Sequence, residues 1–129
     1  MCGVRHVLLA TDSDALAEDV CAALAEPETV VSRVRVGTDV REAVDKLEPE
    51  LVLLDMQIGN MGGIATSIDL RHEARAERLP EVKILMLLDR EVDTWIAGEA
   101  QADAELVKPA DAFRLRKVAM GLLEAVAAD

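Results

Sequence analysis

The chain has 129 residues, enough for one compact domain with a full hydrophobic core and too few for two ordinary domains. It contains 14 Lys and Arg residues and 25 Asp and Glu residues, and the resulting formal net charge of -11 disfavours binding to nucleic acid or to an anionic membrane surface. No run reaches the roughly 20 apolar residues of a membrane span or has the pattern of a secretory signal, so we expect one cytoplasmic domain, residues 1–129, without membrane contact.

Strands and helices are expected to alternate five times along the chain. Apolar runs bounded by turn residues predict strands over residues 5–11, 29–36, 51–55, 82–88 and 106–107. Apolar residues at helical spacing predict helices from Ser13 or Asp14 to about 26, over 39–47, 64–76 and 91–100, and after the cap Asp111. Asp39 and Glu42 also have the spacing of a capping box.

The pattern within the predicted strands indicates how the sheet is covered. The second strand alternates apolar and polar residues, which is typical of a strand with one wetter side near a sheet edge. The third strand has no such alternation, as expected for a parallel strand that helices cover on both faces. Strands that alternate with helices predict an α/β domain, a doubly wound parallel sheet with right-handed crossovers.

Polar residues follow three of the predicted strands: Asp12 the first, Asp55 the third and Lys108 the fifth. The carboxyl ends of neighbouring strands meet at one crevice of such a sheet, so these side chains should lie close together. Two carboxylates repel unless a cation lies between them, and Mg²⁺ prefers such oxygen ligands. Together with a lysine they are the parts of a phosphoryl-transfer site, with Asp55 as the candidate nucleophile.

Three segments resemble the receiver domains of two-component response regulators, and the likeness extends over nearly the whole chain. Residues 8–12 are similar to the end of the first receiver strand with its acidic pair. Residues 51–63 are similar to the segment that carries the phosphoacceptor, and residues 106–109 are similar to the Lys-Pro signature. The resemblance implies a flavodoxin-like sheet of five parallel strands, (βα)5, in the order 2-1-3-4-5.

The resemblance also implies roles for the site residues. Asp55 would accept a phosphoryl group from a histidine kinase, a phosphotransfer protein or a small donor, and Lys108 would contact that group. Mg²⁺ would be held by the side chains of Asp12 and Asp55 and by the backbone carbonyl of Gln57. The Lys108–Pro109 peptide bond would be cis. Such a domain signals by protein–protein contact and is not an enzyme beyond accepting and losing its own phosphoryl group.

Four positions depart from the family pattern. Thr11 stands where the outer acid of the first strand belongs, so the Mg²⁺ site should be weakened. Leu88 replaces the hydroxyl residue that bonds the phosphoryl group, and Asp89, at a position that is normally small, should repel a phosphodonor. Glu105 replaces the aromatic residue of the fifth strand. Two further changes, Gly59 and Gly62, predict a more mobile loop after Asp55.

Trp95 is either a core residue or the exposed anchor of an interface, and we favour the interface slightly. The resemblance implies a partner or homodimer face built from the fourth helix, fifth strand and fifth helix. Our leading hypothesis is an atypical, stand-alone receiver with no output domain in this chain. The alternative is a pseudo-receiver that binds a partner without phosphorylation, whereas a flavin or nucleotide enzyme lacks the glycine-rich motifs it would need.

Overall fold

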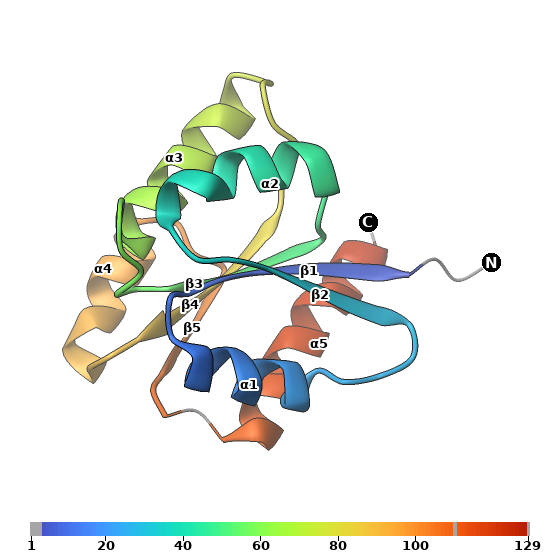
Figure 1. The fold of residues 1–129 in the computed structure, drawn as a ribbon. Helices are drawn as coiled ribbons and strands as arrows, with labels where there is room; N and C mark the ends of the chain where they lie inside the picture. Colours follow the sequence, from blue (N-terminus) through green and yellow to red (C-terminus); the bar gives the residue numbers. More distant parts are fainter. Residues whose placement is uncertain (1–3, 110, 129) are drawn as a thin grey trace.

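The computed structural model describes residues 4–109 and 111–128, which form one α/β layer structure (Figure 1). Within these residues, five parallel strands build a single sheet in the order β2-β1-β3-β4-β5, which confirms the predicted flavodoxin-like topology. The strands are β1 (Arg5–Ala10), β2 (Thr29–Val34), β3 (Leu51–Asp55), β4 (Lys83–Leu88) and β5 (Ala104–Val107). The second strand is an edge strand, as its alternation predicted.

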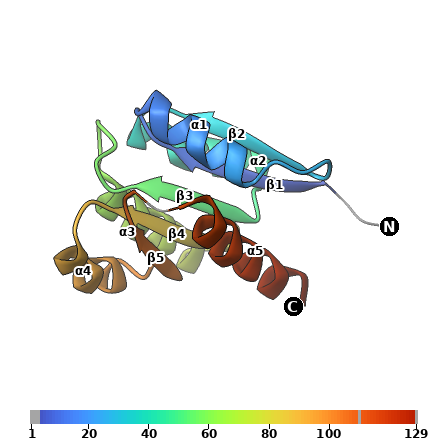
Figure 2. The ribbon, with the colours of Figure 1, turned by 90° about the horizontal axis from the view of Figure 1, so that it is seen from below.

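Helices cover both faces of the sheet (Figure 1, Figure 2). They are α1 (Asp14–Ala23), α2 (Val40–Leu47), α3 (Gly63–Arg75), α4 (Thr94–Glu99) and α5 (Ala112–Ala128). Helices α1 and α5 pack on one face, and α2, α3 and α4 pack on the other. None of the helices in the described part of the chain combines the length and apolarity that a membrane crossing needs.

The central strand β3 supplies both halves of the core. All five of its residues are buried. Leu51 and Leu53 pack in the cluster beneath α1 and α5, whereas Val52 and Leu54 pack in the cluster beneath α2, α3 and α4. Successive side chains of a strand point to opposite faces, so a strand covered on both sides must be apolar throughout. The chain then reaches Asp55 at the end of an anchored strand.

Helix starts differ from the sequence prediction in two places. The 3₁₀ turns Gly37–Asp39 and Glu91–Asp93 precede α2 and α4, which therefore begin later than predicted. Asp39 lies inside the first of these turns with helical backbone angles, and its side chain makes no cap hydrogen bond, so the predicted capping box is wrong. Ser13 does cap α1, because its Oγ accepts from the backbone N–H of Leu16 at 3.1 Å. Asp111 likewise accepts from Arg114 N–H at 2.8 Å.

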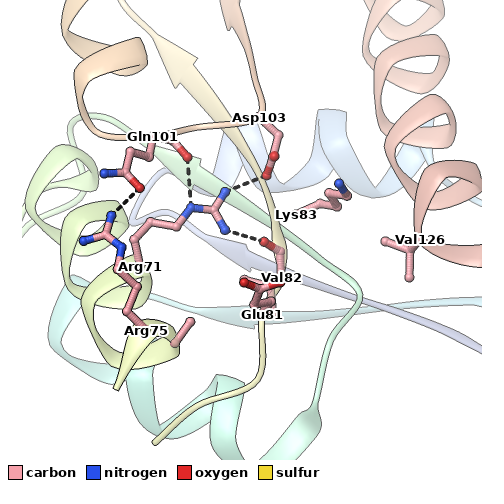
Figure 3. A pocket seen from close by; sticks show the side chains of 9 residues that line it. Arg71, Arg75, Glu81, Val82, Lys83, Gln101, Asp103 and Val126 are labelled. Atoms are coloured by element: carbon pink, nitrogen blue, oxygen red, sulfur yellow. Dashed lines mark hydrogen bonds and ion pairs between the residues drawn. The ribbon is translucent and has the colours of Figure 1, made fainter. Parts of the chain in front are cut away.

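A pocket of about 530 Å³ opens at the amino ends of β4 and β5, the end of the sheet remote from Asp55 (Figure 3). The guanidinium of Arg71, on α3, fills one wall and donates to the backbone carbonyls of Gln101 and Val82 at 2.9 and 2.7 Å. It also donates to Asp103 Oδ2 at 2.6 Å. These three hydrogen bonds of Arg71 join α3 to the segments that lead into β4 and β5, so its contacts are structural.

Candidate functional site

The ends of β1, β3 and β5 bring the side chains of Thr11, Asp55 and Lys108 together. Asp55 is the last residue of β3, and its side chain is only 3% exposed. Its Oδ2 accepts a hydrogen bond from Thr11 Oγ1 at 2.6 Å. Its Oδ1 accepts from Lys108 Nζ at 2.5 Å and from the backbone N–H of Gln57 at 2.9 Å. The predicted convergence of Asp55 and Lys108 is therefore present, and both Asp55 oxygens have donors.

These contacts set the charge state of the site. Burial by itself would raise the pKa of Asp55, but the hydrogen bonds from Lys108, Thr11 and Gln57 outweigh it and hold the pKa below its usual range. Burial would likewise lower the pKa of Lys108, yet the hydrogen bonds to Asp55 and Asp89 raise it. At neutral pH the site therefore contains a carboxylate beside an ammonium group, and a carboxylate is the form that can attack an electrophile.

Asp12 lies at the rim of the site rather than inside it. Its side chain is exposed, and its Oδ2 accepts from the backbone N–H of Gly59 at 3.2 Å. Asp12 and Asp55 offer two carboxylates to a cation, but the described residues contain no cluster of three or more acidic, His or Cys side chains that could hold a metal. Thr11, next to Asp12 in sequence, adds no charge, and its hydroxyl group donates a hydrogen bond to Asp55.

The position after β4 contains a contact that the sequence prediction missed. Leu88 is fully buried in the core on the α2, α3 and α4 side and offers no hydroxyl group. Asp89 Oδ1 lies 3.1 Å from Lys108 Nζ, so this carboxylate pairs with the lysine of the site. The strand register explains the contact, because Leu88 pairs with Val107 and the next residues along the two strands are Asp89 and Lys108.

The loop after β3 is tied to the turn after β2. The backbone N–H groups of Gly37 and Thr38 donate to the carbonyls of Gly59 and Asn60, each at 3.0 Å. A Cβ on Gly37 would lie 1.8 Å from the carbonyl oxygen of Met61, so this close approach requires glycine. The positive φ values in this loop belong to Asn60 and Met61 and not to Gly59 or Gly62, and the expected mobility of the loop stays a prediction.

Two further predicted positions lie away from Asp55. Glu105 is half-buried in β5, and its expected role as a replaced aromatic stays a prediction. Trp95 projects from α4 with 72% of its surface exposed, which excludes the core alternative. Val92, in the turn before α4, is exposed to 73%. An interface role for Trp95 stays a prediction. The Lys108–Pro109 peptide bond is cis, as predicted.

Residues 7–120 match the family model of the response regulator receiver domain. The chain is 32% identical over 114 residues to the DNA-binding response regulator MtrA of Mycolicibacterium paratuberculosis, which covers 82% of this chain and 46% of MtrA. It thus spans about half the length of that curated relative. An uncharacterized response regulatory protein of Mycobacterium tuberculosis is 28% identical over 128 residues, with 95% of this chain and 93% of the relative covered.

Solved structures share the fold. The chemotaxis response regulator CheY4 of Vibrio cholerae superimposes with a TM-score of 0.80 at 20% identity, covering 92% of this chain and 98% of that structure. The receiver domain of NtrX from Brucella abortus superimposes with a TM-score of 0.77 at 23% identity, with 92% and 98% covered. At these identities the likeness concerns the arrangement of helices and strands.

Proposed function

Because the chain belongs to the receiver domains of response regulators, we propose that Asp55 accepts a phosphoryl group from a histidine kinase or a phosphotransfer protein. Receiver domains are signalling modules of two-component systems and not enzymes in the ordinary sense. The observation that supports Asp55 most directly is its ionised carboxylate, held at the end of β3 with Lys108 Nζ 2.5 Å away. The domain then signals by contact with a downstream protein.

The proposed transfer needs a nucleophile and a place for negative charge. A carboxylate oxygen of Asp55 forms a new bond to phosphorus, while the bond between phosphorus and the donor's leaving group breaks. The leaving group keeps the electron pair, as the imidazole nitrogen of phosphohistidine or the carboxylate oxygen of acetyl phosphate. The Lys108 ammonium, which is already next to Asp55, offsets the charge on the phosphoryl oxygens.

Receiver domains generally bind Mg²⁺ at their acidic pocket. Here the ligands would be the side chains of Asp12 and Asp55 and the backbone carbonyl of Gln57, a set of oxygens that suits Mg²⁺ with several retained waters. We propose that the site is weak. Thr11 adds no charge, and its hydrogen bond to Asp55 Oδ2 competes with any cation for that oxygen. When bound, the ion supplies positive charge to the transferred phosphoryl group.

Intact-mass measurement tests this proposal. The protein is incubated with Mg²⁺ and acetyl phosphate, or with phosphorylated histidine kinase, and we expect a gain of one phosphoryl group. The gain should disappear in Asp55→Asn and persist in Asp45→Asn, which changes an exposed carboxylate on α2 by the same charge. An equal gain in Asp55→Asn would show another acceptor, and no gain with any donor would refute the proposal.

A binding module that works without phosphorylation is the second candidate. The observation in its favour is Leu88, which is fully buried and leaves the phosphoryl group without the usual hydroxyl donor of β4. For this candidate we expect no mass gain with any donor, together with unchanged partner binding by Asp55→Asn. The partner would contact the α4, β5 and α5 face, where Trp95 is exposed.

A further inference from the structure

Lys108 is shared between two carboxylates. Its Nζ lies 2.5 Å from Asp55 Oδ1 and 3.1 Å from Asp89 Oδ1. The lysine side chain is 22% exposed, against 3% for Asp55 and 33% for Asp89, so the three groups extend from the buried strand end to the surface. The group that should meet a phosphoryl oxygen thus already has a second anion beside it.

The backbone holds this pair in register. Leu88 and Val107 are partners in the β4–β5 ladder, and Lys108 N–H donates to the Leu88 carbonyl at 2.7 Å. Asp89 and Lys108 therefore leave adjacent strands at the same level. Arg90, the next cation along the chain, pairs with Asp93 at 3.2 Å, so Lys108 is the ion-pair partner of Asp89 among the described residues.

One oxygen of Asp89 makes this pairing unusual. Asp89 Oδ2 is buried and has no hydrogen-bond partner among the described residues, although the carboxylate as a whole is partly exposed. A buried carboxylate oxygen without a donor is costly, so the ion pair with Lys108 is the main compensation for that carboxylate. Displacing Lys108 from Asp89 would leave the carboxylate still less satisfied.

We propose that Asp89 is a positioning residue that competes with the phosphoryl group for Lys108 and so slows phosphorylation of Asp55. This inference rests on the proposed function and concerns its regulation. The transfer itself is unchanged: the bond from the Asp55 oxygen to phosphorus forms as the bond to the leaving group breaks. For its oxygens to reach Lys108, the phosphoryl group must share that ammonium with Asp89, which keeps a negative charge beside the site.

Simple repulsion of the donor at the site entrance makes a different prediction. Repulsion acts through solvent, weakens as salt is added and would be shared by Glu91, an exposed carboxylate two residues away. Competition for Lys108 requires the direct contact at 3.1 Å, which Glu91 does not make in the described structure. Glu91→Gln is therefore the matched control, because it removes the same charge from the same segment.

The first measurement is the initial rate of mass gain with Mg²⁺ and acetyl phosphate at low and high salt. We expect Asp89→Ala and the isosteric Asp89→Asn to react about tenfold faster than the wild type, at both salt concentrations, with Glu91→Gln close to the wild type. Equal rates in the wild type and both Asp89 variants, or an acceleration that Glu91→Gln reproduces, would overturn the inference while leaving Asp55 as acceptor.

The second measurement does not depend on phosphorylation. The pKa of the Lys108 ammonium, followed by NMR of labelled lysine side chains, should be lower in Asp89→Asn than in the wild type and unchanged in Glu91→Gln. An unchanged pKa in Asp89→Asn would show that the contact is not made in solution and would overturn the inference. A lowered pKa with no mass gain in the wild type, Asp89→Ala or Asp89→Asn would refute both the proposed function and the effect of Asp89 on rate.

Discussion

At the scale of single residues, the site is organised by hydrogen bonds that only the folded chain reveals. Because the carboxyl ends of parallel strands meet at one edge of the sheet, the sequence predicted that Asp55 and Lys108 would lie close together. Lys108 Nζ is 2.5 Å from Asp55 Oδ1. The comparison with the receiver family treated Thr11 as a lost acid. In the structure Thr11 is a donor to Asp55 and an acceptor from the backbone N–H of Ser13 at 3.0 Å. The uncharged side chain of Thr11 thus still fixes the orientation of the Asp55 carboxylate.

Replacing Thr11 by the isosteric Val should therefore destabilise the protein. Asp55 Oδ2 and the Ser13 N–H both lose their partner, and the expected loss in the free energy of unfolding is about 1–3 kcal/mol. The pKa of Asp55 should rise, because one of the hydrogen bonds that lower it is gone. Urea unfolding at pH 7 and NMR titration of the Asp55 carboxyl group measure the two effects.

Thr11→Ser is the control for that substitution, because it retains the hydroxyl group. We expect Ser to retain most of the stability and a depressed pKa at Asp55. A Val variant as stable as the Ser variant, with the same Asp55 pKa, would mean that Lys108 and the Gln57 N–H orient the carboxylate without help from the Thr11 hydroxyl.

At the scale of the elements, an ion-pair cluster between α2 and α3 predicts part of the loss of stability in acid. Glu73, on α3, has a side chain only 7% exposed and accepts two hydrogen bonds from Arg78, at 2.9 and 2.8 Å. Arg41 of α2 lies 3.8 Å from the same carboxylate. The hydrogen bonds from Arg78 outweigh the effect of burial and, with the charges of both arginines, lower the pKa of Glu73 from 4.5 to about 2.

This shift predicts how stability changes with pH. A carboxyl group whose pKa is lower in the folded state stabilises that state fully above its unfolded pKa and loses this effect as the pH falls through the folded pKa. For Glu73 the window runs from about 4.5 down to about 2. In Glu73→Gln we expect a smaller loss of unfolding free energy across this window, measured by urea unfolding at a series of pH values.

Glu77→Gln provides the matched control, because Glu77 is an exposed carboxylate just after α3 with no ion pair among the described contacts. Its profile should follow that of the wild type. If Glu73→Gln also follows the wild type, the acid sensitivity between these pH values arises from other carboxylates.

The elements themselves were largely predictable, and the misses have physical causes. Strand β3 and the cap Asp111 were predicted, and Ser13 was one of two candidate caps for α1, because the signals are local: an apolar run and a side chain next to a helix start. The 3₁₀ turns before α2 and α4 were not predicted, since a single turn of 3₁₀-helix and a single turn of α-helix have the same pattern of apolar and polar residues. The Asp89 contact and the close approach at Gly37 depend on pairing between segments distant in sequence, which hydrophobic periodicity does not encode.

At the scale of the whole molecule, the net charge of -11 argues against DNA binding, the activity named for the relative MtrA. MtrA is a DNA-binding response regulator, and this chain covers 46% of it. The part in common is the fold that carries Asp55. Most of the ion pairs between described residues are formed by arginine, so much of the cationic charge is already neutralised by carboxylates of the same chain.

Direct DNA binding by this chain is therefore not expected. A phosphate backbone should be repelled by an acidic protein most of whose arginines are paired, and repulsion should be strongest at low salt. An electrophoretic shift assay with double-stranded DNA at low and physiological salt measures this, with a basic DNA-binding domain as the positive control. A shift at low salt that disappears as salt is raised would contradict the prediction.

The exposure of Trp95 has a consequence for spectroscopy. Trp95 is the single tryptophan of a chain without tyrosine, and 72% of its surface is in contact with water in the folded state. Its emission should already be that of a hydrated indole, so unfolding will change it little, and circular dichroism is the better measure of folding. The same indole becomes a selective reporter for the α4 surface, because a protein that covers it shifts its emission to the blue.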